Sequence, residues 1–177
     1  MDSVTATPDP RHPDRDRNAE GRPENARPRD RFGAPLPRGY DDELAHREEP
    51  ADIVNTLEEA LDRAIALFDE QRFFESHEFF EYVWKSDEVP DGDRDFWKGV
   101  TQVAVGCTHT QRGNVNGAIT LLERATTYMA PYPPRYHGVA ADDLSAAALQ
   151  LAQEVRQEGA SPQRTFFRFP RANQEPT

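Results

Sequence analysis

Apolar side chains recur at helical spacing along most of the chain after residue 50. In the stretch 53–71 the apolar stripe consists of Leu57, Leu61, Ala64, Ile65 and Phe68. Such a stripe is typical of a helix that buries one face. Similar runs predict five helices, over residues 53–71, 74–85, 94–111, 115–129 and 142–157. The expected fold is an all-α, single-domain bundle of about five helices arranged as antiparallel hairpins.

Local signals mark the ends of these helices. Asp52 is the expected N-cap of the first helix, and Asn114 is the expected N-cap of the fourth. Gly113 and Gly159 stand where the third and fifth helices should end, because glycine readily adopts the left-handed conformation that closes a helix. Pro131 stops the fourth helix.

The flanking segments have a different composition. Residues 1–31 are rich in proline, arginine and aspartate and have few large apolar side chains, which predicts a disordered tail. Residues 32–50 are expected to form an irregular docking segment, and residues 51–159 the helical domain. Residues 160–177 are expected to form an extended C-terminal tail that packs its phenylalanines, at 166, 167 and 169, across the helices.

The charge balance narrows the classes of partner. The chain has 32 acidic and 21 basic residues, a net charge of −11, and only Lys85 and Lys98 are lysines. This pattern favours a surface adapted to high salt, and the alternative is an arginine-rich coding bias. In either case we expect no binding to nucleic acid or to a membrane. The single cysteine, Cys107, and the lack of a long apolar run favour a cytoplasmic protein.

The segment 73–84, FFESHEFFEYVW, holds the densest mixture of rings and ionisable groups. On a helical wheel His77 and Glu81 are one turn apart, on the side that carries Phe73, Phe80 and Trp84. The outward or rim positions are those of Glu75, Glu78 and Tyr82. His77 and Glu81 are therefore expected to need polar partners inside the bundle.

The helix over 94–111 is the expected source of those partners. One side of it is apolar, and another carries Gln102 and His109, with Arg112 just beyond its end. Gly99 and Gly106 form a strip where a neighbouring backbone can approach closely. A helix with this pattern is expected to be the central one.

Three kinds of chemistry fit these residues. A divalent metal could be held by His77, Glu81 and His109, because imidazole and carboxylate are suitable ligands. A small ligand or substrate could meet acid–base groups in a half-buried pocket. Alternatively, the groups could satisfy one another as a structural polar network. The full candidate set is His77, Glu78, Glu81, Trp84, Gln102, His109, Arg112 and Asn114.

Two features favour no particular chemistry. The His77–Glu81 stretch begins like a zinc-protease helix, but Glu81 stands where such a helix needs its second histidine. His137 follows a proline-rich stretch and is expected to be an exposed loop histidine.

The segment 73–84 resembles the opening motif of the "domain of unknown function 309" family. A second block is similar over 98–104, at His109, and over 112–114, 117–118 and 121–125, so the resemblance covers about residues 57–130. The matched characteristic positions are His77, Glu78, Glu81, Trp84, Gln102, Gly113, Asn114 and Gly117. Phe79-Phe80 is more aromatic than the family pattern. The resemblance implies a small all-α bundle and brings no reaction with it.

The leading functional expectation is therefore a helical protein that binds a metal or small ligand between two helices, with hydrolase-like chemistry as one form of it. The competing expectation is a non-enzymatic helical-hairpin interaction module that presents a surface to a peptide or protein partner, with the His/Glu cluster as a structural network.

Overall fold

The computed structural model describes residues 16, 18–22, 29–30, 32–36 and 49–172. The chain separates into two compact units, one of residues 1–30 and 34–46, the other of residues 31–33 and 47–177. In the first unit the Asn18 side chain closes a short turn by accepting from the backbone N–H groups of Glu20 and Arg22. The prediction of disorder over 1–31 and of an irregular segment over 32–50 falls mostly outside the described residues.

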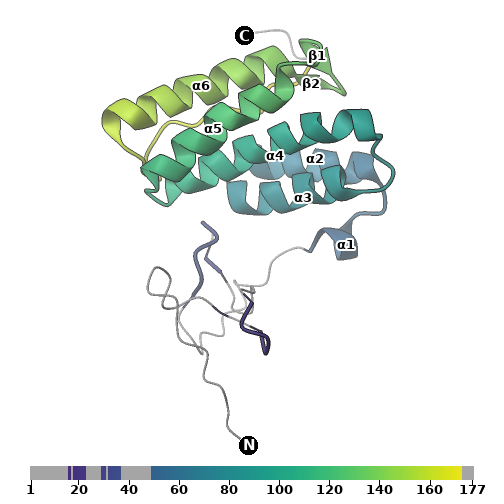
Figure 1. Ribbon diagram of the computed structural model, residues 1–177, viewed down its shortest axis with the longest axis horizontal. Helices are drawn as coiled ribbons and strands as arrows, with labels where there is room; N and C mark the ends of the chain where they lie inside the picture. Colours follow the sequence, from purple (N-terminus) through teal and green to yellow (C-terminus); the bar gives the residue numbers. More distant parts are fainter. Residues whose placement is uncertain (1–15, 17, 23–28, 31, 37–48, 173–177) are drawn as a thin grey trace, which may run out of the picture. The chain divides into compact units, whose positions relative to one another are not determined.

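The second unit confirms the expected all-α fold (Figure 1). Its described helices and strands are α1 (Pro50–Ile53), α2 (Leu57–Asp69), α3 (Phe73–Lys85), α4 (Asp91–Gln111), α5 (Val115–Met129), β1 (Arg135–Tyr136), β2 (Val139–Ala140) and α6 (Ala141–Glu158). From α2 to α6 each helix packs against the next one along the chain, so α4 lies between α3 and α5.

The first predicted helix starts later than expected, and the short helix α1 precedes it. Val54 is extended and separates α1 from α2. Thr56, not Asp52, caps α2, because its side chain accepts from the Glu59 N–H at 3.1 Å. The Glu59 carboxylate in turn accepts from the Asn55 N–H at 2.8 Å. This reciprocal exchange resembles a capping box, and it fixes the helix start four residues later than the pattern predicted.

The central helix begins earlier than predicted. It starts at Asp91, directly after Pro90, rather than at Arg94. The first turn carries Asp91 and Asp93, whose negative charges favour a helix N-terminus. Arg94 also donates a hydrogen bond from its Nε–H to Asp91 Oδ1 at 3.0 Å.

Two glycines let α5 approach α4, as the sequence predicted. A Cβ on Gly99 would lie 2.8 Å from Met129 Cγ, and one on Gly106 would lie 2.7 Å from Leu122 Cγ. Both contacts are closer than normal packing allows. Cys107 lies on the same helix with no exposed surface, so it is a core residue, and burial raises the pKa of its thiol.

A small hairpin precedes α6 and was not predicted. Its two strands are joined by His137 and Gly138, whose φ angles are +48° and +77°. Positive φ at both central residues is the signature of a type I′ turn, the turn that matches the twist of a two-residue hairpin. A histidine held in this conformation is uncommon and indicates constraint by its surroundings.

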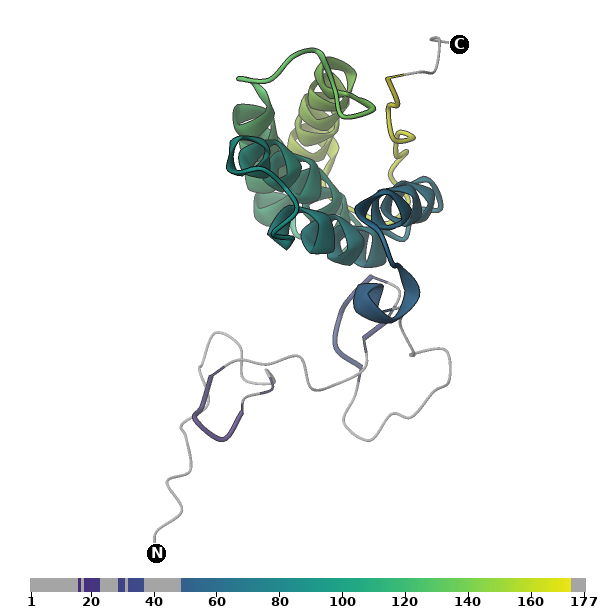
Figure 2. The same cartoon turned by 90° about the vertical axis from the view of Figure 1, so that its right-hand side faces the viewer.

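The C-terminal segment packs against the helices through its phenylalanines, as predicted. Phe166 lies 4.8 Å from Phe73 between ring centroids, and Phe169 lies 5.5 Å from Phe80. The Phe169 N–H donates to Asp69 Oδ1 at 2.7 Å, which anchors the segment to the end of α2. In Figure 2 the yellow C-terminal segment accordingly lies beside the blue α2. Residues 173–177 of the predicted tail lie outside the described residues.

Among the described residues, no helix has the length and apolar character that a membrane span requires.

Candidate functional site

Helix α3 is rotated relative to the predicted wheel. Its buried apolar residues are Phe73, Phe79, Phe80 and Val83. Ser76 lies between them and donates its hydroxyl to the Ala64 carbonyl oxygen at 2.8 Å. The buried direction is therefore set by α2, by α4 and by the C-terminal phenylalanines, and the segment's own periodicity does not give the directions of these neighbours.

Because of this rotation, two carboxylates lie differently from their predicted placement. Glu75, expected to face outward, is buried at 9% exposure and binds Arg72 by two hydrogen bonds of 2.9 and 2.5 Å. That bidentate hydrogen bonding raises the pKa of the Arg72 guanidinium. Glu81, expected to face inward, has a side chain 38% exposed and pairs with Lys85 at 2.6 Å rather than with His77. An exposed pair of this kind adds little stability.

Three other residues do meet on one side of the bundle. The Arg112 guanidinium lies over the Phe74 ring, 5.5 Å from its centroid. The Phe74 ring in turn contacts the His77 ring edge to face, with centroids 4.7 Å apart. His77 Nδ1 also contacts the carbonyl oxygen of Phe74, one turn earlier. The charge of Arg112 also acts on His109. We call the surface formed by Phe74, His77, His109 and Arg112 the α3–α4 face.

A segment distant in sequence lies on this face. The Phe32 carbonyl oxygen accepts from Arg112 Nε at 2.7 Å. Gly33 is buried, with a φ of +75°. A Cβ added there would overlap the Cγ and Cδ2 atoms of the Phe74 ring, so no other residue fits without displacement. Both of these contacts are to the backbone of the segment.

His109 belongs to the turn between α4 and α5. Asn114 caps α5 by accepting from the Gly117 N–H at 3.0 Å, so its amide nitrogen is the group that meets His109 Nδ1 at 2.9 Å. His109 Nδ1 must then accept, which requires the neutral ring. Burial, and secondarily the positive charge of Arg112, lower the pKa of His109 in agreement with this assignment.

The remaining predicted residues are dispersed. Gln102 is half-buried, and its Oε1 has no hydrogen-bond partner within the part of the chain that the structure describes. Glu78 and Trp84 are half-buried on α3, and the Trp84 carbonyl oxygen accepts from Arg94 at 3.0 Å.

The geometry does not support the proposed metal ligands. Glu81 is occupied by Lys85, and the accepting nitrogen of His109 is occupied by Asn114. Within the described ranges, no three His, Cys, Asp or Glu side chains are placed to hold one metal ion. Among the described residues, His77, Glu81 and His109 therefore do not form one metal-binding group.

Sequence reasoning missed a polar cluster at the start of α4. Asp93 accepts from the Tyr136 hydroxyl at 2.6 Å and meets His137 Nε2 at 2.8 Å. The His137 ring stacks on Trp97 with centroids 5.8 Å apart. The bond from Tyr136 lowers the pKa of Asp93 and raises that of Tyr136. The signal available was Gly138, because glycine readily adopts the positive φ angle that a two-residue hairpin turn needs.

Comparison with known protein families finds a match within the helical unit. No curated protein matches the chain. Residues 61–121, from α2 into α5, match the model of the family described as "Domain of unknown function (DUF309)". That range includes Phe74, His77, His109 and Arg112, all four members of the α3–α4 face. Over residues 61–121, then, the chain is similar to the DUF309 family.

Proposed function

We propose that the protein is a non-enzymatic interaction module whose α3–α4 face binds a short peptide segment through its backbone. The observation that carries this proposal is the position of Phe32 and Gly33. The Phe32 carbonyl oxygen accepts from Arg112, and Gly33 is buried against Phe74. A surface that holds one such segment in cis has the groups needed to hold a similar segment in trans.

The contacts define the kind of peptide. Arg112 bonds to a main-chain carbonyl oxygen, which every residue offers, so it selects little at that position. The next residue must be glycine for two reasons. Its φ of +75° is rarely adopted by residues with a side chain, and the Phe74 ring occupies the space of a Cβ. The expected partner is a peptide that carries a residue–glycine step in a tight turn.

The guanidinium is suited to this role. It lies over the Phe74 ring, 5.5 Å from the ring centroid. The Phe74 ring in turn packs against the His77 ring, with centroids 4.7 Å apart. Stacking restricts the guanidinium before a peptide arrives, and a restricted group loses less freedom on binding. His77 thereby serves as a positioning residue for Phe74 and Arg112. This role replaces the metal-binding one in our interpretation.

A trans peptide must compete with Phe32–Gly33 for the face. Because both belong to the same chain, the internal segment has the advantage of a high effective concentration. Weak binding of an external peptide is therefore expected until the internal segment is displaced. Gly33→Ala is the direct means of displacement, since it adds the Cβ that the Phe74 ring excludes.

The test uses the full chain and a fluorescent peptide with the sequence of residues 29–36. We expect the Gly33→Ala chain to bind this peptide about tenfold more tightly than the wild-type chain, measured by anisotropy. A peptide with alanine at the position of Gly33 should not bind. Adding Arg112→Ala to the Gly33→Ala chain should weaken binding of the glycine peptide.

Gly92→Ala is the matched control, because a Cβ at Gly92 meets no atom within 4 Å. This variant should bind the peptide as weakly as the wild-type chain does. The proposal is wrong if the Gly33→Ala chain does not bind the glycine peptide, or if it binds the glycine and alanine peptides equally.

A further inference from the structure

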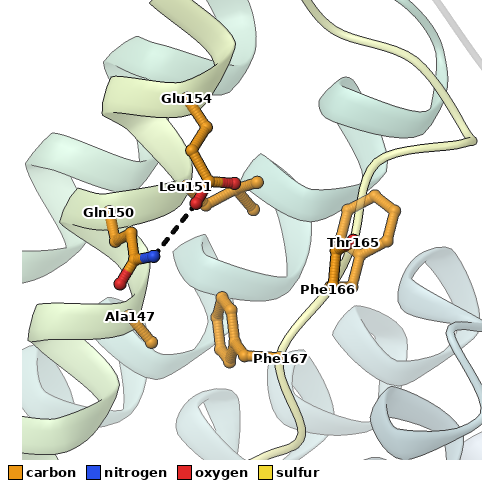
Figure 3. A pocket seen from close by; sticks show the side chains of 7 residues that line it. All are labelled: Ala147, Gln150, Leu151, Glu154, Thr165, Phe166 and Phe167. Atoms are coloured by element: carbon orange, nitrogen blue, oxygen red, sulfur yellow. Dashed lines mark hydrogen bonds between the residues drawn. The ribbon is translucent and has the colours of Figure 1, made fainter.

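A hollow of about 160 Å³ lies between α6 and the C-terminal segment, remote in sequence from the α3–α4 face (Figure 3). Its apolar walls are Ala147 and Leu151 on α6 and Phe166 and Phe167 on the segment. Gln150 and Glu154 add polar groups from α6. The hollow is thus apolar with one carboxylate at its edge.

The walls are fixed by packing on the far side. Phe166 packs against Phe73 of α3, with ring centroids 4.8 Å apart. Phe167 packs against Phe68 of α2, with centroids 5.5 Å apart. The segment is further anchored by the bond from the Phe169 N–H to Asp69. A ligand would therefore meet a surface that is already formed, which reduces the cost of binding.

The size of the hollow suits a single ring. A protein cavity of about 150 Å³ lined by leucine, isoleucine and phenylalanine accepts benzene. The walls here are of the same chemical type, and two of them are aromatic rings that favour edge or face contact with another ring.

The carboxylate of Glu154 determines the charge of the ligand. Glu154 Oε1 accepts from Gln150 Nε2 at 3.0 Å, the bond drawn in Figure 3. The neighbouring arginines are engaged elsewhere, Arg156 with Glu123 at 2.5 Å and Arg164 with Glu158 at 2.5 Å. Over the described ranges no cationic side chain pairs with Glu154. In a chain of net charge −11, a cationic ligand is also favoured by the long-range field.

We propose that this hollow binds a small monocyclic aromatic amine in its ammonium form. The ring would lie between the α6 residues and the two phenylalanines, and the ammonium group would bond to Glu154. The ligand class follows from the apolar volume together with the Glu154 carboxylate, which has no cationic partner among the described residues. The proposal is independent of peptide binding at the α3–α4 face.

The test titrates the full chain with benzylamine, toluene and benzoate, observed by chemical-shift changes of Thr165 to Phe167. We expect saturable binding of benzylamine, weaker binding of toluene, and no binding of benzoate. Glu154→Gln should weaken the binding of benzylamine about tenfold and leave the binding of toluene unchanged, since only the charge-assisted hydrogen bond is lost. Ala147→Leu should abolish the binding of both benzylamine and toluene, because the larger side chain fills the hollow.

Asp142→Asn is the matched control, because it removes one exposed negative charge from the same helix at a position about 140° around the helix axis from Ala147. It should leave benzylamine binding unchanged. Equal binding of benzylamine and benzoate would overturn the proposal, as would unchanged benzylamine affinity in Glu154→Gln. If Ala147→Leu proves unfolded by circular dichroism, the Glu154→Gln result and the comparison of the three ligands decide the matter alone.

Discussion

Arg112 donates its Nε–H to the carbonyl oxygen of Phe32, a residue 80 positions earlier in the chain, at 2.7 Å. The same guanidinium lies over the Phe74 ring, against which Gly33 is buried. One side chain thus connects the end of α4, the start of α3 and a segment that precedes the helical domain. This relationship, rather than a His/Glu cluster, is the basis of the proposed function.

Arg112→Ala should release Phe32 and Gly33 from the α3–α4 face. The variant loses both the hydrogen bond and the contact with the Phe74 ring. We expect the Gly33 amide to exchange with solvent faster, measured by hydrogen exchange, while the amides of α4 remain protected. Arg124→Ala, at an exposed position on α5, provides the control. Unchanged protection of Gly33 in Arg112→Ala would contradict the assigned role.

Asp93→Ala should destabilise the hairpin before α6. The variant removes the acceptor of both Tyr136 and His137. We expect a loss of about 1–3 kcal/mol in the free energy of unfolding, measured with urea. The pKa of Tyr136 should also fall toward its ordinary value, measured by absorbance titration, because the bond to Asp93 is what raises it.

The same carboxylate gives a dependence on acidic pH. The bond from Tyr136 holds the pKa of Asp93 below its ordinary value of 3.8. Its contribution to stability is therefore fully present above that value and is lost as pH falls through the lower folded pKa. Asp93→Ala should remove this part of the acid dependence. Parallel acid-unfolding curves for variant and wild type would contradict the prediction.

Gly106→Ala should destabilise the contact between α4 and α5. The added methyl group would lie 2.7 Å from Leu122 Cγ and 3.3 Å from the Leu122 backbone nitrogen, so the helices must separate. Overpacking of this kind lowers the free energy of unfolding by about 1–3 kcal/mol. Thermal unfolding of the variant and the wild type measures this loss. In Gly92→Ala, where the new methyl group meets no atom within 4 Å, no comparable loss is expected. A Gly106→Ala variant as stable as the wild type would show that the interface adapts.

His109 should make stability fall below neutral pH. Its folded pKa is lowered, mainly by burial, so the unfolded chain binds a proton more readily. The contribution is fully present above the unfolded pKa of about 6.5 and is lost as pH falls below it. His109→Gln should flatten urea-unfolding stability between pH 7.5 and 5.5 relative to wild type. An equal pH dependence in both proteins would rule out this source.

Salt should stabilise the protein if its acidic excess is an adaptation. The net charge of −11 means that like charges repel one another across the surface. Raising the salt concentration from about 0.1 M to about 1 M shortens the screening length from about 10 Å to about 3 Å and so weakens this repulsion. We expect the thermal midpoint to rise over this range of potassium chloride. A midpoint that is constant or falls would favour the coding-bias explanation.

Helix positions were predictable because the signals that set them are local. The end of α4 and the start of α5 follow from Gly113 and Asn114, and the structure places both boundaries as predicted. The predicted start of α2 was wrong, because Thr56 and Glu59 cap the helix four residues after the predicted first residue, and Asp52 does not cap it. The close contact at Gly106 was predictable because only a residue without a side chain allows it.

The candidate site was predicted only in part, because it depends on neighbours. Both His77 and Arg112 were singled out, and the structure brings them together through Phe74. Glu81 was misplaced because a wheel gives relative angles and not the direction of the core. Asp93 and His137 were missed because their meeting depends on a hairpin 44 residues away in sequence.

The sequence by itself determined the class of fold, the helical stretches and the glycine strip of α4, because periodicity, capping and steric size act over a few residues. Only the tertiary structure decided which face of α3 is buried, which carboxylates are paired, and which distant segments meet. Those outcomes depend on the C-terminal phenylalanines that cover α2 and α3, and on Phe32 and Gly33 at Phe74 and Arg112. Contacts between residues distant in the chain are fixed by packing in three dimensions, and no local pattern encodes them.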